Sequence, residues 1–244
     1  MENEKQIPKI NYQLKLEEII EEEEKKEGVP KLLLHSCCAP CSTYVLEYLT
    51  KHFDISVLYY NPNIHPSKEF YKREAEQQRF IDLVEKVNKI ELIKAEYRPE
   101  DYFEAVKGRE NDVEGGASCS LCYELRLAMA ARYAKELGFD YFTTTLSISP
   151  YKNAQIINHI GERLEEKYHI KYLYADFKKK NGFQRSLELC NKFDIYRQNY
   201  CGCVFSLKEA EERRRIRELE EHKKEEILSK LELELKEDLK GVNR

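Results

Sequence analysis

Short apolar runs alternate with helix-like segments along most of this chain, and this alternation limits the fold more than any other feature. The apolar runs, each short enough for a strand, are 31–36, 55–63, 89–97, 139–147 and 170–177. Segments with a helical spacing of apolar residues lie between them, at 43–53, 67–87, 122–138 and 154–168. Alternation of strands and helices predicts an α/β fold with an open, mostly parallel sheet and helices on both faces.

Two polar segments follow predicted strands where an open parallel sheet binds its ligands. The stretch HSCC (35–38) ends the first strand, and SISPYKN (147–153) ends the fourth. Ligands of such sheets bind in the crevice outside the carboxyl ends of the strands. We therefore expect the thiols of the first segment to lie in the binding crevice.

The two ends of the chain carry more charge than its centre. We expect a charged N-terminal extension over 1–30, a catalytic α/β domain over 31–206 and a long charged C-terminal helix over 207–244. Both ends are predicted to be solvated and only partly packed, and a docking helix for RNA or a partner is the alternative for the second. The central region is near neutral, so a nucleic-acid surface there has to be a local basic patch.

The sequence predicts a cytoplasmic protein. The N-terminus is charged and lacks the apolar core of a signal peptide. No apolar run approaches the length of about 20 residues that crosses a bilayer. In a reducing compartment the eight cysteines are not expected to form structural disulfides, and clustered cysteines there favour metal binding or redox chemistry.

The cysteines fall into three clusters. These are Cys37-Cys38-x-x-Cys41, Cys119-x-x-Cys122 and Cys201-x-Cys203, while Cys190 stands alone in a predicted helix. A C-x-x-C pair can present two thiolates from one turn, and the positive end of a helix beginning at Cys119 and Cys122 favours the thiolate form. The glycine between Cys201 and Cys203 allows a tight backbone turn.

Three explanations of these clusters compete. Buried free cysteine is common, and core packing suits Cys190 better than three spaced clusters. Zinc takes four tetrahedral ligands, but the clusters are uneven and hold more than four thiols. An iron–sulfur cluster uses four thiolates and leaves the others for a second metal or a redox pair. The spacing favours iron–sulfur over zinc.

Basic and aromatic residues mix close to the cysteines. The segments are 70–74, 149–153, 177–185 and 196–202. Lys and Arg pair with phosphates while Tyr and Phe stack on bases, so an RNA-binding role is a candidate. His65 follows the second strand and is a better candidate for the pocket than His35, which is equally well explained as a hydrogen-bonded histidine at a strand end.

Five motifs in a fixed order resemble a known family. They are LLLHSCCAPCS, YYNPNIHP, FTTTLSISPYKN, NGFQRS and YRQNYCGCVFS, and the similarity runs over roughly 31–206. This pattern resembles the QueH family of epoxyqueuosine reductases. The resemblance implies a sheet like that of PP-loop nucleotide-binding enzymes. SCCAPCS occupies the place of the phosphate-binding S-G-G-x-D-S loop, so we expect no ATP.

The resemblance also implies a reaction and its cofactors. Members of the family catalyse the last step of queuosine synthesis, in which epoxyqueuosine at the wobble position of tRNA loses its epoxide oxygen. They use a 4Fe-4S cluster and no cobalamin. An adjacent mononuclear iron is a second candidate cofactor. The implied partners are tRNA carrying epoxyqueuosine and an external electron donor, with no membrane.

Carried over by motif, Cys37, Cys38, Cys119 and Cys122 would hold the cluster. Cys201 and Cys203 would be the redox-active, catalytic pair or would hold a second iron, and Cys41 is a candidate ligand of that second metal. Neighbouring side chains of an extended chain point in opposite directions, so Cys37 and Cys38 need a turn to face one cluster.

Other points stay open at this level. His65, Tyr151 and Lys152 are candidate proton donors that no motif assigns. A nearby iron could instead polarise the epoxide oxygen as a Lewis acid. The alternative functions are a tRNA-thiolating enzyme with a cluster on the same scaffold and a zinc- or cluster-bearing tRNA-binding protein.

Overall fold

A computed structural model describes residues 10–110 and 112–242, with side chains up to residue 231. The chain divides into two compact units, Met1–Gln198 and Asn199–Arg244, and each is described by itself. The first unit holds the sheet and the cysteines of the first two clusters. The second holds Cys201, Cys203 and the long helix α8 (Val204–Val242).

The first unit is built on a five-stranded sheet. The strands are β1 (Lys31–His35), β2 (Asp54–Tyr59), β3 (Ile90–Lys94), β4 (Tyr141–Thr144) and β5 (Lys171–Tyr172). Their order in the sheet is β3-β2-β1-β4-β5, and each pair of neighbours is parallel. The predicted open parallel sheet is confirmed, with strands shorter than the apolar runs that predict them.

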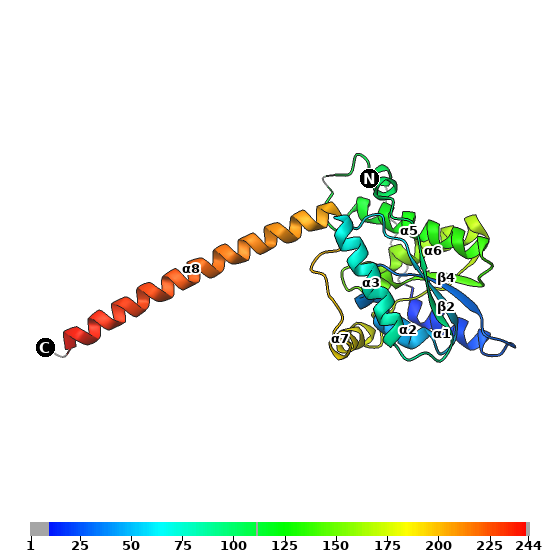
Figure 1. Ribbon diagram of the computed structural model, residues 1–244, viewed down its shortest axis with the longest axis horizontal. Coiled ribbons are helices and arrows are strands. Elements are labelled where there is room, and N and C mark those ends of the chain that lie inside the picture. Colours follow the sequence, from blue (N-terminus) through cyan, green and yellow to red (C-terminus); the bar gives the residue numbers. More distant parts are fainter. Residues whose placement is uncertain (1–9, 111, 243–244) are drawn as a thin grey trace. The chain divides into compact units, whose positions relative to one another are not determined.

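Helices cover both faces of this sheet (Figure 1). One face carries α2 (Ala39–Leu49), α3 (Ser67–Leu83) and α7 (Gly182–Lys192), and the other carries α5 (Ala117–Glu136), α6 (Ala154–Tyr168) and the short α4 (Pro99–Ala105) beside α5. Strand β1 shows why two cores form. Leu32 and Leu34 enter the core on the α2 side, and Leu33 enters the other, because successive strand side chains alternate between faces.

The charged N-terminal region contributes a packed helix, α1 (Tyr12–Glu23). Its apolar residues recur at helical spacing, and Tyr12, Leu16 and Ile20 are all buried in the two cores. The hydroxyl of Tyr141 donates a hydrogen bond of 2.6 Å to Glu23. The N-terminal region is therefore partly packed, as predicted, because the apolar stripe of α1 covers the core. The predicted boundary at residue 30 stays a prediction.

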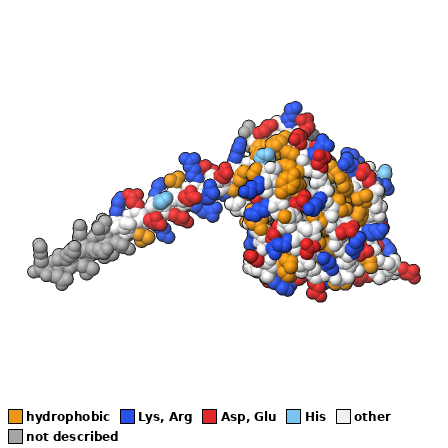
Figure 2. Space-filling view, viewed as in Figure 1, with side chains coloured by type: hydrophobic (Ala, Val, Ile, Leu, Met, Phe, Trp, Pro, Cys, Tyr) orange, Lys and Arg blue, Asp and Glu red, His pale blue; other side chains and the backbone are white. Residues whose placement is uncertain are grey.

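The predicted long charged helix is present as α8. Its described side chains from 211 to 231 are exposed, and acidic and basic groups are interspersed along them (Figure 2). Ion pairs one turn apart join Arg213 to Glu209 and Lys230 to Glu226. Such pairs each support a solvated helix by a few tenths of a kcal/mol, about 0.2–0.5. Across the described residues, every helix is too short or too polar to cross a bilayer.

One close contact inside the sheet–helix interface can be tested. Gly161 of α6 lies against the ring of Tyr172, and a Cβ at position 161 would overlap that ring. Tyr172 is 2% exposed and packs against Phe142 at a centroid distance of 5.0 Å, so it has little room to move. We expect Gly161→Ala to destabilise the fold by about 1–3 kcal/mol, although alanine is the better helix former.

Urea unfolding of Gly161→Ala, Tyr172→Leu and the double variant measures this contact. Because leucine removes the ring that the new methyl group meets, the double variant should cost less than the sum of the single changes. An unchanged unfolding free energy for Gly161→Ala would show that Tyr172 yields freely.

Candidate metal and redox site

The first cysteine cluster lies at the point where the order of strand addition in the sheet reverses. From β1 the chain builds outward to β2 and β3, then returns to place β4 on the other side of β1. The crevice outside the carboxyl ends of two such strands is the usual binding site of an open α/β sheet. His35 ends β1 beside Thr144, which ends β4. Cys37 follows directly, and its Sγ is 3.8 Å from the hydroxyl oxygen of Thr145.

The three thiols of this cluster form one group. The Sγ atoms of Cys37, Cys38 and Cys41 all lie within 4.8 Å of one another. Those of the adjacent pair Cys37 and Cys38 are 3.6 Å apart. Cys38 has an extended backbone and occupies the position before α2, while Cys41 lies in the first turn of that helix with Pro40 before it. The turn therefore overcomes the alternation that would separate neighbouring side chains in a strand.

The thiols differ in acidity because they share hydrogen bonds. Those from Cys38 and Cys41 hold the pKa of Cys37 well below its usual value, and the charges of Lys152 and Arg126 act in the same direction against burial. The same contact with Cys37, together with burial, raises the pKa of Cys38 to about 12. The group thus favours one thiolate at Cys37, stabilised by its two neighbours.

This donor set fits a soft metal centre. Thiolates are the ligands of zinc and of iron–sulfur clusters, and three converge here at the end of a strand. Two of them lie at the N-terminus of α2, where the helix dipole favours negative charge. The residues present therefore fit a metal cofactor held in part by Cys37, Cys38 and Cys41.

Buried polar side chains hold the cysteine turn in place. Gln77 of α3 is fully buried, and its Oε1 accepts hydrogen bonds from Ser36 at 2.7 Å and Ser42 at 3.1 Å. The amide of Asn61 donates to the Ser36 carbonyl at 2.9 Å. Gln77 and Asn61 are supporting residues that the sequence analysis missed. Asn61 lies in the motif YYNPNIHP without having been singled out, and Gln77 lies in a helical segment with no motif.

A third amide contacts a thiol directly. The Nε2 of Gln198 donates to the Sγ of Cys38 at 3.1 Å. Arg73 of α3 is 1% exposed and pairs with Glu69 at 2.7 Å, and its positive charge favours the thiolate form of Cys38. Gln198 belongs to segment 196–202, which the sequence analysis gave as a candidate RNA-binding segment and as part of the motif that holds Cys201, but Gln198 itself was not singled out.

The second cluster begins a helix, as predicted. Cys119 and Cys122 lie in the first turns of α5, and the Gly115 amide donates to the Sγ of Cys119 at 3.2 Å. Cys119 and Cys37 pack against the same hydrophobic core, and Cys122 is buried. The group of three neighbouring thiols consists of Cys37, Cys38 and Cys41 and does not include this pair. A ligand role for Cys119 and Cys122 therefore stays a prediction.

The third cluster belongs to the second unit. Gly202 adopts a φ of 138°, so the predicted tight turn between Cys201 and Cys203 uses a conformation that favours glycine. The Cys203 thiol and the Ser206 hydroxyl are 3.3 Å apart at the start of α8. Both cysteines are partly exposed. Cys190, in contrast, is buried in the core beside α2, as the packing explanation has it.

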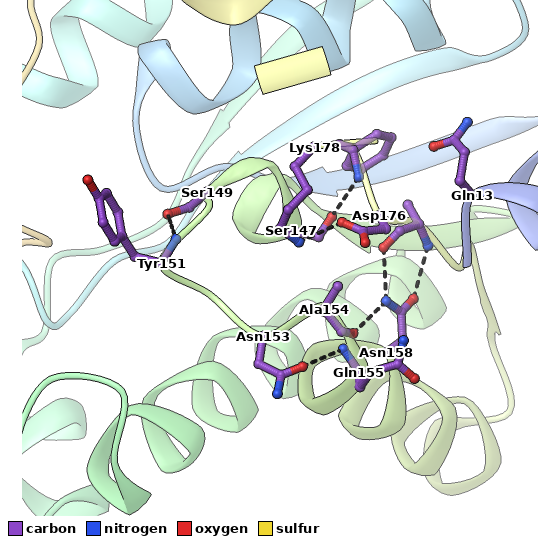
Figure 3. Close-up of polar contacts among 12 residues, drawn as sticks. Gln13, Ser147, Ser149, Tyr151, Asn153, Ala154, Gln155, Asn158, Asp176 and Lys178 are labelled. Atoms are coloured by element: carbon purple, nitrogen blue, oxygen red, sulfur yellow. Dashed lines mark hydrogen bonds and ion pairs between the residues drawn. The ribbon is translucent and has the colours of Figure 1, made fainter. Parts of the chain in front are cut away.

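His35 and Tyr151 differ in their exposure to solvent. His35 is fully buried; its Nε2 donates to the Tyr60 carbonyl at 3.2 Å, and its Nδ1 accepts from Thr144 at 2.8 Å. Burial, followed by the charge of Arg126, lowers the pKa of His35 to about 3, so it is neutral. Tyr151 is 85% exposed, and its ring projects from the loop ahead of α6 (Figure 3).

The polar contacts beyond that loop are structural. The Asn153 side chain caps α6 by accepting from the Gln155 amide at 2.9 Å. Asn158 makes hydrogen bonds of 2.9 Å with both the amide and the carbonyl of Ala175 (Figure 3). These contacts join α6 to the end of the sheet and fix the base of the loop that carries Tyr151 and Lys152.

The sequence is similar to proteins of one described family. A family model described as "Epoxyqueuosine reductase QueH" matches residues 32–209. The protein "Epoxyqueuosine reductase QueH" of Streptococcus pyogenes serotype M1 is 46% identical over 202 residues, which cover 82% of this chain and 79% of that protein. A protein of the same name from Staphylococcus epidermidis is also 46% identical, covering 81% and 85%. The one from Thermotoga maritima is 37% identical, covering 75% and 93%.

A solved structure aligns more weakly. It is described as "U34-tRNA thiolase NcsA from Methanococcus maripaludis with its [4Fe-4S] cluster", and it is 14% identical with a TM-score of 0.45 over 84% of this chain and 75% of that chain. This similarity is too low to support a statement about the site. The family model and the relatives, by contrast, span most of the sequence. The chain therefore belongs to the QueH family of epoxyqueuosine reductases.

Proposed function

We propose that this protein reduces epoxyqueuosine to queuosine at the wobble position of tRNA. The observation that carries the proposal is a group of three thiols at the switch point of the sheet in a chain of this family. In the reaction two electrons and two protons enter, both C–O bonds of the epoxide break, and the products are an alkene and water. The site must therefore deliver electrons and protons to one oxygen atom.

We propose that Cys37, Cys38, Cys119 and Cys122 hold a 4Fe-4S cluster. The low pKa of Cys37 and the helix N-terminus at Cys119 and Cys122 support thiolate ligands. Cys41 lies close enough to Cys37 and Cys38 to act at the same centre or on an adjacent mononuclear iron. When bound, an iron–sulfur cluster supplies electrons one at a time.

We further propose that Cys201 and Cys203 supply the two electrons that the reaction requires. A dithiol releases two electrons and two protons when it closes to a disulfide. Partial exposure and the turn at Gly202 support this role, because both thiols are accessible on a short, tightly turning segment. An external electron donor then restores the dithiol. A second iron held by these cysteines is the alternative.

The proton for the departing oxygen has three candidate sources, His65, Tyr151 and Lys152. Lys152 is only partly exposed, and its charge acts on Cys37, which favours it. His35 is unsuited because both of its ring nitrogens already have hydrogen-bond partners in the core. A buried neutral imidazole held in this way cannot exchange protons readily with a substrate.

The substrate base has to leave the stack of the anticodon loop to reach the site. Tyr151 is exposed, and the partly exposed Lys152 beside it acts through its charge on Cys37, so this is the pair we favour. Stacking on such an aromatic ring contributes about 1–3 kcal/mol per base. Because the substrate is tRNA, we propose that the protein acts in the cytoplasm.

The direct test uses anaerobic protein reconstituted with iron and sulfide, tRNA carrying epoxyqueuosine, and a strong reductant. Digestion of the tRNA and mass spectrometry of its nucleosides should show a product lighter by one oxygen. Unreduced epoxyqueuosine in the presence of an intact cluster and reductant would refute the proposed reaction. Analysis of iron, zinc and sulfide in the same sample distinguishes an iron–sulfur enzyme from a zinc-containing RNA-binding protein.

The ligand assignment predicts the result of a single substitution. Cys119→Ala should reduce bound iron and sulfide to background, because a cluster that loses one of four thiolates is no longer held. Cys190→Ala is the matched control, since Cys190 is buried in the core and belongs to none of the clusters. Equal iron and sulfide contents in the two variants would remove Cys119 from the ligand set.

The redox role of the third cluster makes a different prediction. Cys203→Ala should keep its iron and sulfide but lose turnover, because the remaining Cys201 cannot form the disulfide. Cluster content and nucleoside analysis of one preparation measure both quantities, again beside Cys190→Ala. Turnover at the unmodified rate would exclude the dithiol mechanism.

A further inference from the structure

The segment 193–198 is fixed on the surface of α3 by several contacts. The guanidinium of Arg79 donates to the Asp194 carbonyl at 2.7 Å and to the Phe193 carbonyl at 3.2 Å. The backbone amide of Tyr196 donates to Glu76 at 2.7 Å. Because these bonds come from one helix, the backbone leading to Gln198 has a defined position relative to the cysteine turn that α3 also supports.

Tyr196 is held from a second side. Its hydroxyl lies 3.2 Å from both oxygens of Glu69, the carboxylate that also pairs with Arg73. The ammonium of Lys72 lies 3.4 Å from the centre of its ring, a cation–π contact. A rigid anchor of this kind is what a side chain two residues later needs if it is to hold one orientation.

Gln198 uses that position to direct its amide at a thiol. Its Nε2 is 3.1 Å from the Sγ of Cys38, a sulfur that is almost completely buried. Its Oε1 is also buried, and among the described residues no group donates a hydrogen bond to it. A buried acceptor without a donor costs stability. Reversing the amide would place this oxygen against the sulfur, so the observed orientation is the one that gives Cys38 a donor.

We propose that Gln198 is a positioning residue that sets the reduction potential of the metal centre through its hydrogen bond to Cys38. The inference rests on the proposed function, because it requires Cys38 to be a ligand. Reduction adds negative charge that spreads onto the ligand sulfurs, and an N–H group directed at a sulfur stabilises that charge. Such hydrogen bonds and burial are among the factors that tune iron–sulfur potentials.

Gln198 suits this role better than a charged residue. Arg73 already supplies a positive charge near Cys38 and is balanced by Glu69. A neutral amide adds a directional donor without changing the net charge of the site, so its contribution falls on one sulfur. Losing it should therefore shift the potential while leaving the number of ligands unchanged.

The test is a redox titration of the anaerobic, reconstituted full-length protein, followed by visible absorbance and electron paramagnetic resonance. Gln198→Met keeps the size of the side chain and removes the donor. Gln78→Met is the matched control, because Gln78 is a partly exposed residue of α3, bonded to Asp82 and not to the cysteine turn. We expect equal iron and sulfide in both variants and a lower potential in Gln198→Met alone. A tenfold change in the reduction equilibrium corresponds to about 59 mV for one electron.

A second variant extends the test. Gln198→Glu keeps the shape but places an acceptor and a negative charge beside the sulfur, so its potential should fall further than that of Gln198→Met. An unchanged potential in both variants, with intact clusters, would overturn the inference. Loss of the cluster from both folded variants would also overturn it, because the amide would then be needed for assembly.

Failure of this inference can be distinguished from failure of the proposed function. If Cys38→Ala keeps the wild-type cluster and potential, Cys38 is no ligand and the inference fails, whatever the nucleoside assay shows. If the wild-type protein reduces epoxyqueuosine and Gln198→Met leaves the potential unaltered, the inference alone fails. If the wild-type protein takes up no cluster, the proposed cofactor fails and the inference fails with it.

Discussion

The reversal of strand order between β1 and β4 is the constraint on which the rest of this site depends. Parallel strands all end at the same edge, and the reversal sends the chain away in opposite directions from two neighbouring strands. The pair His35 and Thr144 closes the sheet at that point with a buried hydrogen bond of 2.8 Å. Residues directly beyond it, the cysteine turn on one side and Thr145 on the other, therefore meet.

The cysteine turn is held by neutral amides and balanced charges rather than by a strongly positive pocket. Gln77 and Asn61 support its backbone and hydroxyl groups, and Arg73 is paired with Glu69. A buried thiolate needs hydrogen bonds and nearby positive charge to remain ionised. Cys37 has both, from its neighbouring thiols and from the charges of Lys152 and Arg126. This arrangement brings three sulfur atoms together that can all act as metal ligands.

Most of the fold and part of the site could be predicted from the sequence. The strand–helix alternation predicted the parallel sheet, and the HSCC stretch was correctly placed at a strand end. The N-terminal region was predicted to be partly packed, but the residues of α1 that enter the core were not identified, because its apolar stripe is short and lies among acidic residues. In an extended strand, the side chains of Cys37 and Cys38 would point in opposite directions. The structure brings their sulfur atoms together because the chain turns between β1 and α2.

The sequence by itself determined the chemistry available to this protein: clustered thiols, their motif order and a sheet that carries one cluster at its carboxyl edge. These are local features, set by periodicity and spacing. Only the tertiary structure decided which side chains support the thiols. Gln77 and Gln198 are far from the cysteine turn in sequence. Gln77 bonds to Ser36 and Ser42 because α3 packs beside α2, and Gln198 bonds to Cys38 because α3 anchors segment 193–198. Hydrogen bonds between distant residues depend on packing, which no local pattern encodes.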